Sequence, residues 1–191
     1  AMDPAAEARV QEKVTQAQDG LAEEFRARRS LLRRHSLAAW LHKRGGRMKT
    51  WKKRFCTIEN GVLYYYVSPS DRESGKAALG ALVLRNAAAR RPTDLAHKGK
   101  YKDTCFRVDL DSAEQATLVA SVAPAADDDD DEDDGQAAAD ARGRPAKAKW
   151  IFAATSVAAM DEWMGAIAFW RSEGYKVLKE VRLGGKTLSE A

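Results

Sequence analysis

Residues 37–67 read LAAWLHKRGGRMKTWKKRFCTIENGVLYYYV, in which three short apolar segments are separated by two turns. The first turn contains Gly45 and Gly46, and the second is the pair Asn60-Gly61. An Asn-Gly pair between two apolar runs is the strongest short-range signal for a β-hairpin. The stretch therefore predicts three consecutive antiparallel strands. They span residues 37–44, 50–58 and 62–67.

More strands and a helix are expected toward the C-terminus. Phe106, Val108 and Leu110 alternate with polar residues, which is the period of a half-buried strand. The further predicted strands are 78–84, 106–110, 116–122 and 149–154. Seven short strands and a helix predict a mainly β fold with α, in which a closed or nearly closed antiparallel barrel is capped by the C-terminal helix.

The final helix has its own start and stop signals. Thr155 and Ser156 are candidate N-caps, and Gly174 is expected to end the helix, leaving residues 174–191 as a tail. Its apolar positions fall on one broad face that must cover a core. They are Val157, Met160, Trp163, Met164, Ile167 and Trp170.

Residues 5–35 predict a separate amphipathic helix that precedes the barrel. Val10, Val14, Ala17, Leu21 and Phe25 recur at spacings of three and four, so they form one stripe. The C-terminal part of the helix is cationic, which is typical of helices that lie on anionic membranes. Its arginines are Arg26, Arg28, Arg29, Arg33 and Arg34. Two interpretations are open, which need not exclude each other: the stripe contacts a membrane, and the stripe packs on the neighbouring domain.

The charge of the chain is strongly asymmetric. The formal net charge is +4, from 32 Lys and Arg against 28 Asp and Glu. Eight acids form one block, Asp127–Asp134, so the rest of the chain carries 32 − 20 = +12. From Arg26 to Arg54 there are twelve basic residues and no acid. Such asymmetry predicts attraction to a polyanion, which is a phospholipid surface, a nucleic acid or an acidic protein.

The acidic block lies in residues 123–148, which contain no aromatic or branched apolar residue. Such a composition cannot bury enough surface to offset its ordering entropy, so we expect a disordered insertion. The insertion is either simply solvated or competes for the basic surface of the same chain.

Several function classes lack support. The longest apolar run, 77–84, is far shorter than the ~18 residues that span a bilayer. Two Cys and three His are too few for a zinc module or a disulfide framework, so both Cys56 and Cys105 are expected to be buried apolar residues. Gly185-Lys186-Thr187 lacks the first glycine of a phosphate loop. We expect no enzyme, no metal and no cofactor.

The order of the elements resembles that of pleckstrin homology (PH) domains, and so do the residues. The matching segments are WLHK (40–43), GRMKTWKKRF (46–55), LYY (63–65) and Trp163 in the last helix. The resemblance covers about residues 37–171, with the domain placed at 36–173, and the first hairpin is most similar to the phosphoinositide-binding members. It implies a module that binds anionic phospholipid headgroups through a basic mouth, and a nucleic acid is not the expected partner.

The resemblance also implies the site residues. Lys43 and Arg54 match the headgroup ligands of the family, and we expect antiparallel pairing to bring them together. Tyr65 matches a phosphate-contacting tyrosine, and Lys52 projects from the same face as Arg54. The further expected ligands are Arg44, Arg47, Lys49, Lys53 and Lys76. Expected membrane contacts are Arg33, Arg34 and Trp51, although Trp51 is equally consistent with a core position.

A second, weaker resemblance is to the acylated PH-domain proteins of apicomplexan parasites, which sense phosphatidic acid. It implies a lipoprotein that is cytoplasmic and peripherally membrane-associated, yet neither cysteine is terminal and no glycine follows Met2. Residues 1–4 resemble a cloning remnant. Three alternatives stay open at this point. The basic loop 90–102 is either a second cationic edge or a solvated loop. The alternatives to lipid binding by the whole chain are a protein-interaction scaffold and, after it, a nucleic-acid binder that stacks bases on its aromatics.

Overall fold

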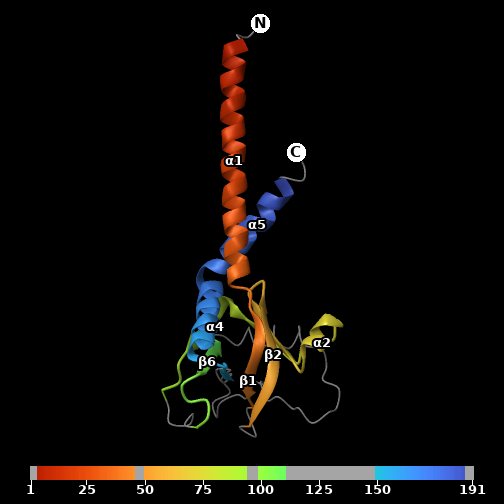
Figure 1. The fold of residues 1–191 in the computed structure, drawn as a ribbon, viewed down its shortest axis with the longest axis vertical. Helices are drawn as coiled ribbons and strands as arrows, with labels where there is room; N and C mark the ends of the chain where they lie inside the picture. The colour runs from red at the N-terminus through yellow and green to blue at the C-terminus, as the bar shows by residue number, and fades with distance from the viewer. Residues whose placement is uncertain (1–3, 46–49, 94–98, 111–148, 188–191) are drawn as a thin grey trace, which may run out of the picture. The chain divides into compact units, whose positions relative to one another are not determined.

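The computed structural model describes residues 4–45, 50–93, 99–110 and 149–187 of the 191-residue chain. The chain divides into two units, residues 35–175 and residues 1–34 with 176–191, which we describe separately. Figure 1 colours the elements of both along the chain. Within the described ranges, no helix has the length and hydropathy needed to cross a membrane.

The larger unit is built on a seven-stranded antiparallel sheet in the order β4-β3-β2-β1-β7-β6-β5. The strands are β1 (Ala38–Arg44), β2 (Trp51–Glu59), β3 (Val62–Tyr66), β4 (Gly80–Val83), β5 (Ala87–Arg90), β6 (Cys105–Leu110) and β7 (Lys149–Ala153). The first three confirm the predicted hairpins. Asn60 and Gly61 have φ values of 50° and 82°, which the tight turn between β2 and β3 requires.

Two elements differ from the expectation. The sequence did not predict β5, because four residues reading AAAR contain no branched or aromatic side chain. Helix α2 (Pro69–Glu73) lies between two predicted strands, where no helix was expected, and Ser68 begins it with a capping box to Asp71. The predicted strand 116–122 and the insertion 123–148 lie outside the described residues.

The hydrophobic core lies between the sheet and helix α4 (Val157–Phe169), which packs on β5 and β6 (Figure 1). Ser156 caps this helix as predicted, since its Oγ accepts a hydrogen bond of 3.1 Å from the Ala159 N–H. Burial of large apolar side chains is the main stabilising term. The largest fully buried ones include Trp163, Trp170, Phe106, Phe152, Leu63 and Leu82.

The prediction that Gly174 ends the last helix is wrong. The chain continues through the π-helical segment η3 (Trp170–Gly174) into helix α5 (Tyr175–Thr187). A Cβ on Gly174 would come within 2.4 Å of Trp170 Cε3, so this glycine permits close packing of the indole. Tyr175 then donates a hydrogen bond of 2.6 Å from its hydroxyl to Gly61 O, which ties the start of α5 to the β2–β3 turn.

The smaller unit contains helix α1 (Pro4–Arg34) and most of α5. The predicted N-terminal helix is thereby confirmed. Arg28 forms ion pairs with Glu24 at 3.3 Å and with Glu180 of α5 at 3.2 Å. Val10 and Leu21 of the predicted apolar stripe are more than half exposed, at 58% and 64%.

Candidate functional site

Strands β1 and β2 place three of the predicted cations on one face of the sheet. In their register, Lys43 lies opposite Lys52, and Leu41 lies opposite Arg54. Because side chains alternate between faces, Lys43, Lys52 and Arg54 share the inner face with the buried Leu41. Lys43 and Arg54 are therefore diagonal neighbours, two residues apart in register. We define this group together with Tyr65 as the inner-face site.

Tyr65 of β3 completes the inner-face site from the other side of β2. The Lys43 ammonium group lies over its ring, 4.9 Å from the centroid. Lys43 and Tyr65 are only 6% and 5% exposed, whereas Arg54 is half-buried and Lys52 is exposed. A Cβ on Gly80 would come within 2.1 Å of Tyr65 Oη, so glycine is required beside this hydroxyl. The three cations of this face therefore differ in burial: Lys43 is the most buried and Lys52 the most exposed.

The pKa of the Cys56 thiol depends on the positive charges of this face. Cys56 lies opposite Tyr65, and its burial raises the pKa of the thiol to about 12. The positive charges of Lys43 and Arg54 act in the opposite direction on the same group. Both cations are therefore close enough to act on one buried atom, which agrees with their diagonal placement.

The other predicted ligands lie elsewhere. Arg44 and Lys53 project from the outer face of the same hairpin, because they alternate with Lys43 and Lys52. Lys76 follows α2, is highly exposed and contacts Asp71 Oδ1 at 3.7 Å. Arg47 and Lys49 lie outside the described residues. Arg33 and Arg34 occupy the exposed last turn of α1.

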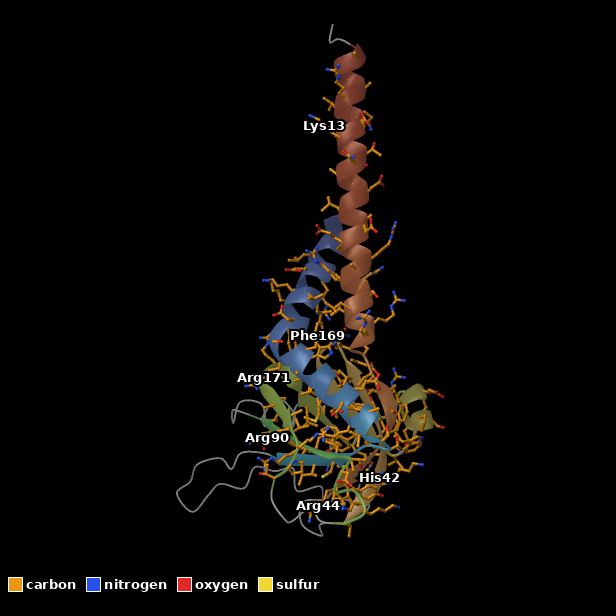
Figure 2. All side chains as sticks on the ribbon, turned by 60° about the vertical axis from the view of Figure 1, so that its left-hand side comes forward. Lys13, His42, Arg44, Arg90, Phe169 and Arg171 are labelled. Carbon is orange, nitrogen blue, oxygen red and sulfur yellow. The ribbon has the colours of Figure 1, made fainter. Side chains whose placement is uncertain are left out.

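The outer face of the β1–β2 hairpin carries a cluster of rings. Trp51 is half-buried there and contacts Tyr101 at a centroid distance of 4.9 Å, so it does not belong to the core under α4. Tyr101 also contacts His42, at 4.7 Å. Figure 2 labels His42 and Arg44 on this hairpin. Sequence reasoning missed Tyr101, since the only signal was an aromatic residue within the basic loop.

His42 is electrostatically perturbed at this position. Burial lowers the pKa of the imidazole from its usual value of 6.5, and the charges of Lys100 and Lys53 lower it further. The described residues contain no group of three or more His, Cys, Asp or Glu side chains that could hold a metal ion.

Comparison with known proteins identifies the domain. The family model of the PH domain matches residues 36–169. The "Ankyrin repeat, PH and SEC7 domain containing protein secG" of Dictyostelium discoideum is 53% identical over 34 residues, which cover 18% of this chain and 3% of that protein. Mouse cytohesin-4 is 36% identical over 55 residues, covering 29% of this chain and 13% of that protein. The chain thus spans a small part of these relatives.

Two solved PH-domain structures are also similar to this chain. The PH domain of human oxysterol binding protein-related protein 11 is 17% identical, with a TM-score of 0.45 over 74% of this chain and 83% of that one. The Slm1 PH domain in complex with inositol-4-phosphate is 15% identical, with a TM-score of 0.43 over 71% and 95%. These comparisons do not support the resemblance to the acylated apicomplexan proteins.

Proposed function

Because the chain belongs to the pleckstrin homology (PH) domain family, we propose that it binds anionic phospholipid headgroups and thereby attaches peripherally to membranes. The headgroup carries a phosphomonoester, as in phosphatidic acid or a phosphoinositide. The observation that carries the proposal is the inner-face site, where Lys43, Lys52, Arg54 and Tyr65 share one face of three adjacent strands.

The chemistry of these side chains suits a phosphate group. Arg54 offers a planar fork that can donate two parallel hydrogen bonds to phosphate oxygens, and Lys52 offers a mobile point charge. The charge of Lys43 lies in a buried setting, where electrostatic attraction is screened less than in water. A headgroup that meets all three cations is bound more strongly than one that meets only the exposed Lys52.

Helix α1 supplies a second attachment in this proposal. The segment from Arg26 to Arg34 contains five arginines and no acid, so it is attracted to an anionic bilayer. Arg33 and Arg34 are exposed in its last turn, and Trp51 adds an amphipathic ring at the start of β2. Two weak membrane attachments together give stable anchoring, whereas one alone gives only marginal membrane binding.

Co-sedimentation with vesicles at near-physiological salt tests the proposal. We expect pelleting with vesicles that contain phosphatidic acid or a phosphoinositide, and none with neutral vesicles. The variant Lys43→Glu/Arg54→Glu should lose this binding. Because Lys43 is buried, Lys52→Glu/Arg54→Glu is the companion variant that is expected to fold normally.

A charge-matched control separates the site from overall charge. Lys176→Glu/Lys179→Glu changes two exposed lysines of α5 and alters the net charge by the same amount. We expect this control to bind like the wild type. Equal pelleting with neutral and anionic vesicles, or equal binding by all three variants, would refute the proposal.

The choice of headgroup is tested by a vesicle panel. Vesicles with phosphatidic acid, phosphatidylserine or one phosphoinositide, at equal total charge, distinguish recognition of a phosphomonoester from attraction to charge alone. Weak binding to phosphatidylserine is expected, because its phosphate is a diester. Gel shifts with RNA and DNA measure the competing nucleic-acid hypothesis, for which we expect only salt-sensitive binding.

A further inference from the structure

The N-terminal half of helix α1 carries an apolar stripe that nothing in the described part of the chain covers. Every side chain from Glu7 to Leu21 is exposed, and those of Val10, Val14 and Leu21 are 58%, 43% and 64% exposed. Figure 1 shows this part of α1 extending past the end of α5. We define residues 7–21 as the exposed segment of α1. Beyond it, the half-buried residues of the helix are Ala22, Phe25, Arg28, Leu31 and Leu32.

The chain itself occupies the same side of α1 farther along the helix. Val14, Leu21 and Arg28 follow one another at intervals of seven residues, which is about two full turns, so they lie on one side. Arg28 forms its ion pair with Glu180 of α5 at 3.2 Å. Helix α5 therefore meets this side of α1 at Arg28, and the same side stays open from Val10 to Leu21.

The exposed segment needs a packing partner to be a stable helix. Val10, Val14, Thr15 and Gly20 all have lower helix propensity than alanine, so the segment gains little from its composition. Most helices in proteins are stabilised by packing of an apolar face rather than by propensity. The uncovered stripe is the face that such packing would use.

An anionic membrane does not fit this part of α1. Residues 4–24 have two basic and five acidic side chains, a net charge of 2 − 5 = −3. All the arginines of the cationic part of the helix follow this stretch, from Arg26 onward. Because like charges repel, the exposed segment would be held away from an anionic surface. A protein surface is therefore the better partner for the stripe.

The spacing of the stripe is symmetric. Val10, Val14, Ala17 and Leu21 follow one another at intervals of four, three and four residues, which read the same from either end. Two antiparallel copies of α1, related by a twofold axis between residues 15 and 16, bring Val10 opposite Leu21 of the second copy and Val14 opposite Ala17. Each contact then occurs twice, as in other twofold interfaces. The alternating intervals of three and four are also those of a coiled-coil seam.

Charge and the position of α5 favour the antiparallel over the parallel arrangement. In a parallel pair, the two segments Arg26–Arg34, each with five arginines and no acid, would lie side by side. Both copies of α5 would also meet at one end of the pair, on the side of α1 that faces the seam. In the antiparallel pair the two arginine segments lie at opposite ends, roughly 40 Å apart at 1.5 Å per residue.

We propose that the exposed segment of α1 pairs antiparallel with the same segment of a second copy of this chain. The stripe spans only about three turns of helix, so the dimer forms and dissociates with protein concentration. The pairing does not depend on headgroup binding by the inner-face site.

Sedimentation velocity of the full chain over a range of concentrations measures this association. We expect the wild type to approach twice the monomer mass as the concentration rises. Val14→Glu/Leu21→Glu should raise the dissociation constant more than about tenfold, because it buries unpaired charges in the seam. The matched control, Ala8→Glu/Gln16→Glu, adds the same charge at exposed positions on the opposite side of α1 and should associate like the wild type. A wild type that is monomeric throughout, or a Val14→Glu/Leu21→Glu variant that associates like the control, would overturn the proposal.

Cysteine cross-linking determines the orientation of the two helices. Cys56 and Cys105 are buried, so cysteines introduced on α1 are the ones expected to react. When tagged Val10→Cys chains are mixed with untagged Leu21→Cys chains under mild oxidation, the mixed disulfide should predominate. Two copies of residue 10 lie about 16 Å apart along an antiparallel pair, which is too far for a disulfide.

The other outcomes of the cross-linking contradict the proposal. Predominant disulfides between two Val10→Cys chains would show a parallel pair. No cross-link at concentrations where the wild type associates would place the dimer contact elsewhere on the molecule.

Discussion

The ammonium group of Lys43 lies 4.9 Å from the centre of the Tyr65 ring, although the two residues belong to strands that are not neighbours in the sheet. Strand β2 lies between them, so the contact spans three strands on the inner face. Both side chains are almost completely buried. The deepest cation of the inner-face site is therefore held by an aromatic face, whereas Arg54 and Lys52 of the same face are more exposed.

Tyr65 is expected to have separable roles in stability and in binding. Tyr65→Ala removes a buried ring and should lower the free energy of unfolding by about 3–5 kcal/mol, as for other large-to-small core changes. Tyr65→Phe keeps the ring under Lys43 and should lower stability far less. If the hydroxyl contacts phosphate, Tyr65→Phe still weakens vesicle binding severalfold. Urea unfolding and co-sedimentation measure the two effects, and an unchanged stability for Tyr65→Ala would contradict the packing described.

The two cysteines should be unreactive in the native protein. Both Cys56 and Cys105 are buried from reagents, and burial also raises the pKa of the Cys56 thiol to about 12, so almost no Cys56 thiolate is present at pH 8. A colorimetric thiol reagent at pH 8 should react negligibly with the folded chain. In guanidinium chloride the same assay should count both of the chain's 2 cysteines. Rapid labelling without denaturant would show that the inner face opens.

Gly61→Ala should be among the more destabilising single changes. Gly61 has φ of 82°, and an added Cβ would lie 2.5 Å from Tyr175 Cζ. The matched control is Gly75→Ala, where φ is 73° and no atom lies within 4 Å. The control measures the backbone strain alone, about 1–2 kcal/mol. Gly61→Ala should cost at least about 1 kcal/mol more, because the Tyr175 hydroxyl also loses its hydrogen bond. Equal unfolding free energies for the two variants would argue against this contact.

His42 should make stability depend on pH. Its pKa in the folded protein lies below the unfolded value of 6.5, so between these values the unfolded chain binds more protons. The free energy of unfolding should therefore fall as pH drops from 6.5 toward the lower, folded pKa. His42→Gln should make the free energy of unfolding depend less on pH in this range. Urea unfolding at several pH values measures this dependence. Lys100→Gln should also reduce it, because one cause of the lowered pKa is removed. The same dependence of the free energy of unfolding on pH in the wild type and in both variants would exclude His42 as its source.

Local signals in the sequence determined most of the fold. The alternation of apolar and polar residues and the Asn-Gly turn specify β1 to β3. Both signals are local, because the two-residue period of a strand and the backbone conformation of a turn depend only on neighbouring residues. The Ser156 cap and the apolar face around Trp163 likewise specify the start of α4. The pairing of β1 with β2 followed from these signals, and with it the shared face of Lys43 and Arg54.

Only the tertiary structure decided the remaining features. Gly174 reads as a helix stop, but the indole of Trp170 packs against it and the helix continues. Strand β5 has no signal of its own and forms because β6 offers a partner edge. The burial of Lys43 under Tyr65 and the approach of Lys100 to His42 join residues far apart in the chain. Such contacts depend on how the strands close around a common core, and residue spacing carries no information about distances across that core.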